Sequence, residues 1–170
     1  MKLKRNSIIF NVLFFLSLIL NFINLKLYEK TIIRIEIILV FYAIGILFFM
    51  MFKNNLKKIS PWNDFNNFVF SFLVVGSYLT IIFLGANYSF SKKQTELKTY
   101  EIVRKTEING GKYNRNNKTP AVIINTENND TKRIEFKRNL KNKVDFSNSL
   151  ELTLSKGLFN FYIIRNAELK

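Results

Sequence analysis

The sequence contains no cysteine and no histidine among its 170 residues. The missing cysteine excludes disulfide bonds and thiolate chemistry, although it does not identify a cellular compartment. The missing histidine removes the commonest general base and the commonest metal ligand. The chain also lacks a glycine-rich phosphate loop, a nucleophile elbow, and a pair of carboxylates placed for acid–base catalysis or for a metal. We therefore expect no enzyme activity, no catalytic residue, no metal and no cofactor.

Arginine is also scarce, because seven arginines stand against nineteen lysines in a chain with a formal net charge of +14. A basic chain can bind nucleic acid or anionic lipid. Arginine is the better residue for recognising phosphates, so this composition does not favour nucleic acid. We interpret most of the charge as solvated surface.

Three long apolar runs occupy the first half of the chain, at residues 8–25, 32–52 and 68–86. Each is about the twenty residues that a helix needs to cross the hydrocarbon core of a bilayer. The runs are apolar nearly all the way round, whereas a soluble amphipathic helix shows a polar face. A cleaved signal peptide competes for the first run, but that run is long, Asn21 and Asn24 end it, and no small-x-small site follows. We predict three transmembrane helices within residues 1–90.

Two charges, Arg34 and Glu36, lie in the first turn and a half of the second run. Positions i and i+2 point to different helix faces, so we do not expect these two residues to pair with each other. Arg34 can extend its stem to the headgroups, and Glu36 is expected near a lysine such as Lys26 or Lys30. The alternative is an ion, proton or gating site, because ionisable groups inside a membrane are functional candidates.

The connection KNNLKKISPWNDFNN between the second and third runs is polar and basic. Ser60 before Pro61 is typical of an N-cap followed by the first helical position, so the third helix is expected to begin near Pro61. Lysines and aromatic rings at span ends anchor helices at the membrane–water interface. The predicted anchors are Lys57, Lys58, Trp62 and Tyr88.

Small residues in the second and third runs could allow helices to approach closely. No strict GxxxG motif is present, which favours packing within the chain over self-association. The small residues are Gly45, Ser71, Gly76, Ser77 and Gly85.

Basic residues are almost evenly divided between the two ends of the helices, so the positive-inside rule gives a near tie. The short first tail is densely basic, which favours a cytoplasmic N-terminus. Three spans then place residues 91–170 outside the cytoplasm, on the outer side of the plasma (inner) membrane.

After residue 90 the pattern changes to alternating apolar and polar residues, which indicates half-buried strands. Five strands are predicted, at residues 98–108, 121–126, 131–137, 150–155 and 158–165. Asn128-Asn129-Asp130 and Lys156-Gly157 are expected to form hairpin turns, and Asp145 is placed in a polar loop. We predict a small all-β antiparallel domain at residues 91–170, barrel-like or an open sheet. Its predicted core is Tyr100, Ile102, Val122, Ile124, Ile134, Phe136, Leu152, Leu154, Phe161 and Ile163.

One cluster of basic residues stands out in this second half. Its candidate anion or partner contacts are Arg133, Lys137, Arg138, Lys141 and Lys143. Lys132 belongs to the same stretch but falls on the opposite face of its strand, so the cluster is not one continuous patch. The cluster is either a solvated face or a contact for lipid headgroups, a polyanion or a nucleotide.

The segment KGLFNFYII, residues 156–164, places a Lys-Gly turn before alternating aromatic residues. Through this feature, residues 90–164 resemble the C-terminal part of a group of small, uncharacterised bacterial membrane proteins. Those proteins have a few N-terminal spans and end in a β-domain. No activity is assigned to that group, so the resemblance implies an architecture only. A second likeness is to antiphage effectors that join membrane helices to a β-barrel sensing a cyclic nucleotide, although no ligand-binding motif of theirs matches this chain.

These observations predict a non-enzymatic integral membrane protein whose β-domain binds a partner or packs in a homo-oligomer. Its expected partners are the lipid bilayer and another protein or a second copy. The alternative is a ligand-gated membrane effector whose β-domain senses a small anionic, nucleotide-like ligand.

Overall fold

The computed structural model describes residues 2–109, 117–126 and 130–170 of the chain. These residues form two compact units. One unit contains the helices up to Ser89, except for residues Glu29–Ile32. Those four residues belong with Phe90–Lys170 to the second unit, a grouping that the hydropathy pattern did not predict.

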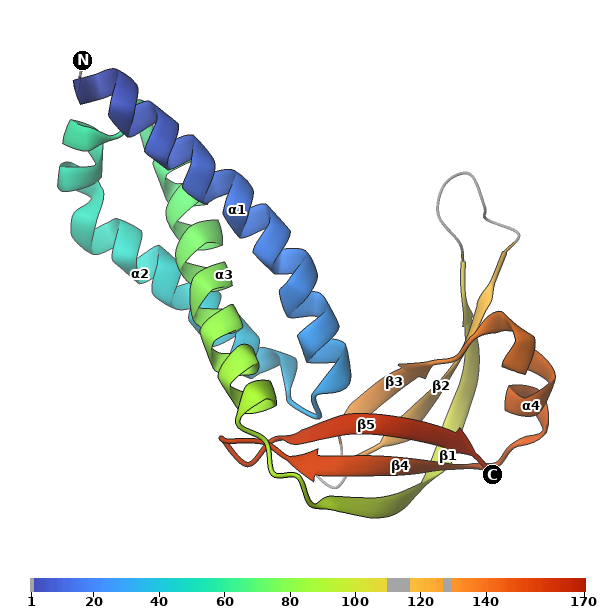
Figure 1. The fold of residues 1–170 in the computed structure, drawn as a ribbon. Helices are drawn as coiled ribbons and strands as arrows, with labels where there is room; N and C mark the ends of the chain where they lie inside the picture. The colour runs from blue at the N-terminus through green and yellow to red at the C-terminus, as the bar shows by residue number, and fades with distance from the viewer. Residues whose placement is uncertain (1, 110–116, 127–129) are drawn as a thin grey trace. The chain divides into compact units, whose positions relative to one another are not determined.

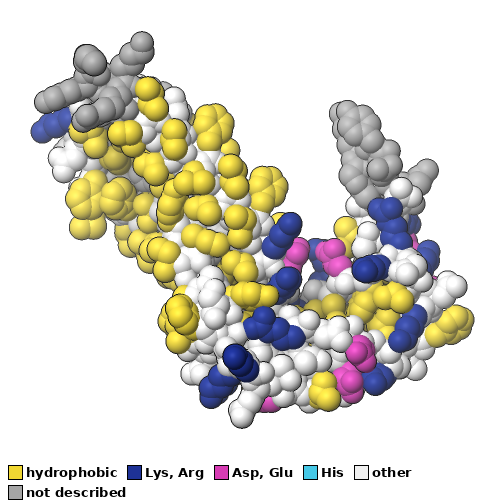
Figure 2. Space-filling view, viewed as in Figure 1, with side chains coloured by type: hydrophobic (Ala, Val, Ile, Leu, Met, Phe, Trp, Pro, Cys, Tyr) yellow, Lys and Arg dark blue, Asp and Glu magenta, His cyan; other side chains and the backbone are white. Residues whose placement is uncertain are grey.

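Three long helices make up the first unit: α1 (Lys2–Lys30), α2 (Ile35–Ile59) and α3 (Asp64–Ser89) (Figure 1). All three are long and apolar enough to cross a membrane, with candidate spans Asn6–Lys30, Ile35–Ile59 and Asp64–Ser89. Hydrophobic side chains cover much of the visible face of these helices (Figure 2), as expected where lipid replaces water as the solvent. The prediction of a helical membrane region is confirmed in length and apolar character.

The ends of α2 and α3 differ from the predicted ones. Ser60 follows α2 as its C-cap, and α3 begins at Asp64 rather than near Pro61. The Ser60 hydroxyl accepts a bond from the backbone N–H of Trp62 at 3.0 Å instead of capping a helix. Asn63 takes the capping role, because its Oδ1 accepts from the backbone N–H of Asn66 at 2.8 Å.

Two glycines allow α2 and α3 to pack closely, as predicted. A Cβ atom at Gly45 would lie 2.7 Å from the backbone oxygen of Ser71 and 2.9 Å from Cα of Phe72. A Cβ at Gly76 would overlap the ring of Tyr42. Gly85 was predicted to share this role, but nothing lies within 4 Å of a Cβ built there. Gly45 and Gly76 lie on helix faces that pack against the neighbouring helix, whereas Gly85 does not. Only the packed structure shows this difference.

The second unit is a five-stranded antiparallel half-barrel with the strand order β3-β2-β1-β4-β5 (Figure 1). Its strands are β1 (Thr95–Ile108), β2 (Thr119–Asn125), β3 (Thr131–Glu135), β4 (Ser149–Lys156) and β5 (Tyr162–Leu169). The predicted small all-β antiparallel fold is confirmed. Of the two predicted turns, the one at residues 128–129 lies outside the described residues, and Thr126 N–H donates to the Asp130 oxygen beside it at 2.8 Å.

The long strand β1 gives the sheet its curvature. Its first half, through Glu101, pairs with β4, and its second half, from Ile102 onward, pairs with β2. The register shifts between Ile102 and Arg104, and an irregularity of this kind bends a strand and increases its twist. One strand can therefore serve both sides of the half-barrel.

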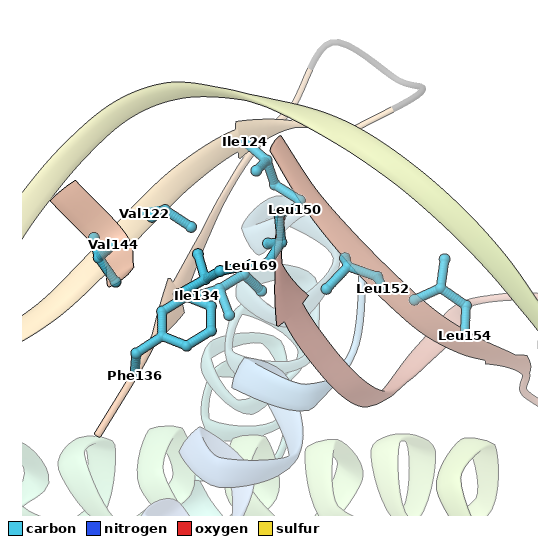
Figure 3. Packing of buried hydrophobic residues seen from close by; sticks show 9 residues of the cluster. All are labelled: Val122, Ile124, Ile134, Phe136, Val144, Leu150, Leu152, Leu154 and Leu169. Atoms are coloured by element: carbon cyan, nitrogen blue, oxygen red, sulfur yellow. The ribbon is translucent and has the colours of Figure 1, made fainter. Parts of the chain in front are cut away.

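The concave side of the sheet is filled by aliphatic side chains and one phenylalanine (Figure 3). The buried cluster consists of Val122, Ile124, Ile134, Phe136, Val144, Leu150, Leu152, Leu154 and Leu169. Most of its strand residues follow from the alternation in the sequence. Val144 does not, because it lies on a helix that was predicted to be a polar loop.

A short helical segment, η1 (Arg138–Leu140) followed by α4 (Lys141–Phe146), joins β3 to β4. Leu140 and Val144 both pack toward the core cluster. Their spacing of four residues matches one helix face, and this is the signal that could have predicted α4. Asp145 therefore lies on a helix and not in a loop.

The last strand also begins later than predicted. Phe159 lies in the turn before β5 and is 43% exposed, so it does not share a strand face with Ile163 as predicted. Ile163 is fully buried, but Ile164 is the residue that packs against the core cluster. The turn is closed by a bond from Gly157 N–H to the Phe161 oxygen at 3.0 Å. Asn160 adopts a left-handed conformation with φ of 66°, which asparagine tolerates well. The Lys-Gly turn thus continues through the aromatic residues that follow it.

Candidate functional site

Arg34 and Glu36 form an ion pair, contrary to the prediction. Arg34 Nε lies 3.5 Å from Glu36 Oε2, and both side chains are more than half exposed. The prediction failed because it assumed that both residues are helical. Arg34 is the N-cap of α2 with an extended backbone (φ −72°, ψ 139°), so the angular spacing of a helix does not apply to it. Such an exposed pair contributes little to stability.

The predicted interface anchors have different surroundings. Lys57 Nζ lies 2.8 Å from Asp64 Oδ2, joining the end of α2 to the start of α3. Lys58 is exposed, and Tyr88 is half-buried near the end of α3. Trp62 packs on Phe10, with ring centroids 5.7 Å apart, and thus connects the α2–α3 loop to α1. Whether these residues meet the membrane interface stays a prediction.

A polar seam that the sequence analysis missed joins the three helices. It consists of Asn21 and Asn24 on α1, Tyr42 on α2 and Ser77 on α3. Asn21 Nδ2 donates to Ser77 Oγ at 2.8 Å, and Tyr42 OH donates to Asn21 Oδ1. Asn24 Nδ2 donates to the Ser77 backbone oxygen at 3.0 Å. The two asparagines had been interpreted as the end of an apolar run, whereas they face the interior of the bundle.

Polar groups inside a membrane are satisfied mainly by one another. The seam lies past the middle of α1 and joins positions that are far apart in sequence. Ser17, which is fully buried, precedes the half-buried Asn21 by four residues, and the buried Asn24 follows Asn21 by three. This spacing along one helix face was the available signal.

Replacing Asn21 by leucine should destabilise the helical unit by about 1–2 kcal/mol, because Tyr42 and Ser77 lose a shared hydrogen-bond partner. The measurement is the free energy of unfolding of the full chain in mixed micelles of a mild detergent and sodium dodecyl sulfate. Asn11→Leu is the matched control, since Asn11 lies on the same helix and is exposed. Equal losses for the two variants would show that the seam contributes nothing specific.

Within the second unit, Thr31 connects the two edge strands of the half-barrel. It forms an isolated antiparallel bridge with Ile163 of β5, and the neighbouring Ile32 N–H donates to the Tyr162 oxygen at 2.8 Å. From the opposite edge, Lys132 Nζ of β3 donates to the Thr31 backbone oxygen at 2.8 Å. We call this arrangement of Thr31, Lys132 and Ile163 the clasp.

Lys132 is an unusual component of the clasp, because it is a lysine whose side chain is buried. It lies on the opposite strand face from the exposed Arg133, as predicted. Lys132 is only 7% exposed. Burial disfavours its charged form and lowers the pKa of Lys132 from 10.5 to about 8, while nearby Glu29 opposes that change. The amine is therefore still mostly protonated at neutral pH, but it loses its proton at a lower pH than an exposed lysine does.

Two members of the predicted basic cluster are neutralised by acidic neighbours. Arg133 Nη2 lies 3.4 Å from Glu135 Oε1, and Lys141 Nζ lies 2.6 Å from Glu107 Oε1. Lys118 also reaches Glu107 at 3.1 Å. Hydrogen bonds from Lys141 and Lys118 hold the pKa of Glu107 below its usual value. Arg133, Lys141 and Lys118 are therefore paired with acidic side chains of the same chain.

The other three members, Lys137, Arg138 and Lys143, are exposed and make no ion pair among the residues that the structure describes. Phe146, at the end of α4, is 86% exposed. We call these four residues the α4 corner. Figure 2 shows Lys and Arg side chains beside a hydrophobic side chain over the part of the sheet unit that carries α4. The structure thus divides the predicted cluster into a paired part and an unpaired part.

The described residues contain no group of three or more acidic side chains placed to hold a metal ion. Comparison of the chain with protein-family models, curated proteins and solved structures finds no match.

Proposed function

We propose that this chain is an integral membrane protein without catalytic activity, whose sheet unit acts by binding a partner or by self-assembly through its outer surface. The observation that carries the proposal is the position of the functional groups. The concave side of the half-barrel is filled, with Val122, Ile124 and Leu152 fully buried, whereas the unpaired cations and the exposed phenylalanine of the α4 corner lie outside.

A hollow of about 200 Å³ beside α4 gives little support to a sensor of small anions. Glu107 and Asp145 contribute to its lining, and a carboxylate repels an anion. Lys105 Nζ is bound to the backbone oxygen of Asp145 at 2.6 Å. The ligand-gated effector is therefore the second candidate, and no described cavity favours it.

The proposal includes an orientation. The basic first tail favours a cytoplasmic N-terminus in the plasma membrane, and three spans then place the sheet unit on the extracytoplasmic side. A partner of the α4 corner would be met there.

Single cysteines can test the orientation and the partner together, because the natural chain has no thiol. Asn142→Cys places a thiol on the exposed side of α4, and Thr99→Cys places the control thiol on the exposed face of β1. Intact cells and purified protein are treated with a membrane-impermeant maleimide. We expect Thr99→Cys to react fully in both samples and Asn142→Cys to react several-fold more slowly in cells, because a bound partner covers the α4 corner.

Equal reaction of the two thiols in cells and in purified protein would overturn the proposal that this surface is occupied. Reaction of both thiols only after permeabilisation would overturn the orientation and favour the effector with a cytoplasmic sensor.

A further inference from the structure

We propose that the partner of the α4 corner is an anionic lipid surface, with Lys137, Arg138 and Lys143 contacting headgroups and Phe146 entering the interface. The inference rests on the proposed function and names the partner that covers this surface.

The α4 corner carries unpaired positive charge. The fold neutralises Lys141 with Glu107 and Arg133 with Glu135, yet it leaves Lys137, Arg138 and Lys143 exposed. The three lie within seven residues of the chain, around η1 and α4. Anionic headgroups attract basic residues that cluster near a bilayer, and each cation raises the binding constant about fivefold.

Phe146 adds an exposed apolar ring to the α4 corner. A single exposed apolar residue is common on soluble domains and alone indicates nothing. Here the exposed ring lies two residues after a buried anchor, because Val144 is 1% exposed in the core. Ser147 N–H closes the helix end on the Lys143 oxygen at 3.0 Å. The ring is thus presented by a fixed turn beside cations, which is the composition of an interfacial membrane contact.

A short connection attaches the sheet unit to the long apolar helices. Only residues 90–94 separate α3 from β1, so the unit is always close to a bilayer. Tethering replaces a bimolecular encounter by an intramolecular one with a high effective concentration. A weak surface contact that would be negligible for a free domain can then be populated.

The test uses the full chain with Asn142→Cys carrying an environment-sensitive dye, placed in nanodiscs. One set contains phosphatidylcholine only, and the other contains equal parts of phosphatidylcholine and phosphatidylglycerol. We expect blue-shifted emission and quenching by headgroup spin labels in the anionic nanodiscs only, and loss of both signals at high salt. Lys137→Gln, Arg138→Gln and Lys143→Gln together should abolish the signals.

A matched triple variant controls for net charge. Arg104→Gln, Lys156→Gln and Lys170→Gln remove the same charge from other positions of the sheet unit, and this variant should keep the anionic response. Phe146→Ser should keep the salt-sensitive contact but lose most of the blue shift.

Three results would overturn the lipid assignment. They are no dye response in anionic nanodiscs, the same response in both lipids, and a response to free inorganic phosphate or ATP in phosphatidylcholine nanodiscs. If Asn142→Cys is protected from maleimide in cells but the dye emission does not respond to anionic lipid, the covering partner is a protein. The proposed function then stands without this inference. If Asn142→Cys is unprotected in cells, the proposed function itself fails.

Discussion

Gly45→Ala is expected to destabilise the helical unit by about 1–3 kcal/mol, although it adds a single methyl group. The new Cβ would lie 2.7 Å from the Ser71 oxygen and 2.9 Å from Cα of Phe72. Both atoms belong to the backbone of α3, so no side-chain rotation can relieve the overlap. The two helices must separate or shift, and the contacts along their interface weaken.

Gly85→Ala is the matched control, because nothing lies within 4 Å of a Cβ at that position on α3. In a helix interior, alanine is favoured over glycine by about 1 kcal/mol, so this variant should be neutral or slightly more stable. The single tryptophan, Trp62, is a built-in reporter, since it packs against Phe10 of α1 and Phe70 of α3.

Trp62 fluorescence during detergent-driven unfolding of the full chain gives the free energy for each glycine variant. Equal stability of the Gly45 and Gly85 variants would mean that α2 and α3 do not approach as the structure describes.

The second large effect concerns pH and Lys132. Its pKa is about 8 in the folded chain, against 10.5 for an unperturbed lysine. Between these two values the unfolded state holds a proton that the folded state has released, so the free energy of unfolding rises with pH. Below pH 8 both states are protonated, and above pH 10.5 both are neutral, so the contribution is then constant. The total rise is about 3 kcal/mol.

The variant that tests this is Lys132→Met, which keeps a long unbranched side chain and removes the titrating amine. The stability of the sheet unit in the full chain is measured by pulse proteolysis in urea, from pH 7 to pH 11. We expect the wild-type protein to gain about 3 kcal/mol relative to the methionine variant over this range.

Lys137→Met is the control, because it removes a lysine from an exposed position and should keep the wild-type rise. Parallel pH curves for the wild-type protein and Lys132→Met would show that Lys132 is not buried in the clasp.

The helices and strands are the part of this protein that local sequence could predict. A membrane span needs only about twenty apolar residues in a row, and a half-buried strand needs only alternation. Both signals are complete within one segment, so the three helices, the antiparallel sheet and most of the core followed from them. The opposite directions of Lys132 and Arg133 also followed, because neighbours along a strand point to opposite faces.

Pairings between distant segments could not be predicted in this way. Arg34 meets Glu36 because the backbone is extended at Arg34, and the Thr31 clasp depends on which strands form the sheet edges. Neither feature is encoded by residue spacing alone.

By itself, therefore, the sequence determined that the chain has three helices long and apolar enough to cross a membrane and a small antiparallel sheet, because the period of the hydrophobic pattern is a local property. Only the tertiary structure decided which cations are free. Lys141 is bound to Glu107, which is thirty-four positions away, and Lys143 remains exposed. The two lysines are equivalent in the sequence and differ only in what the fold brings next to them.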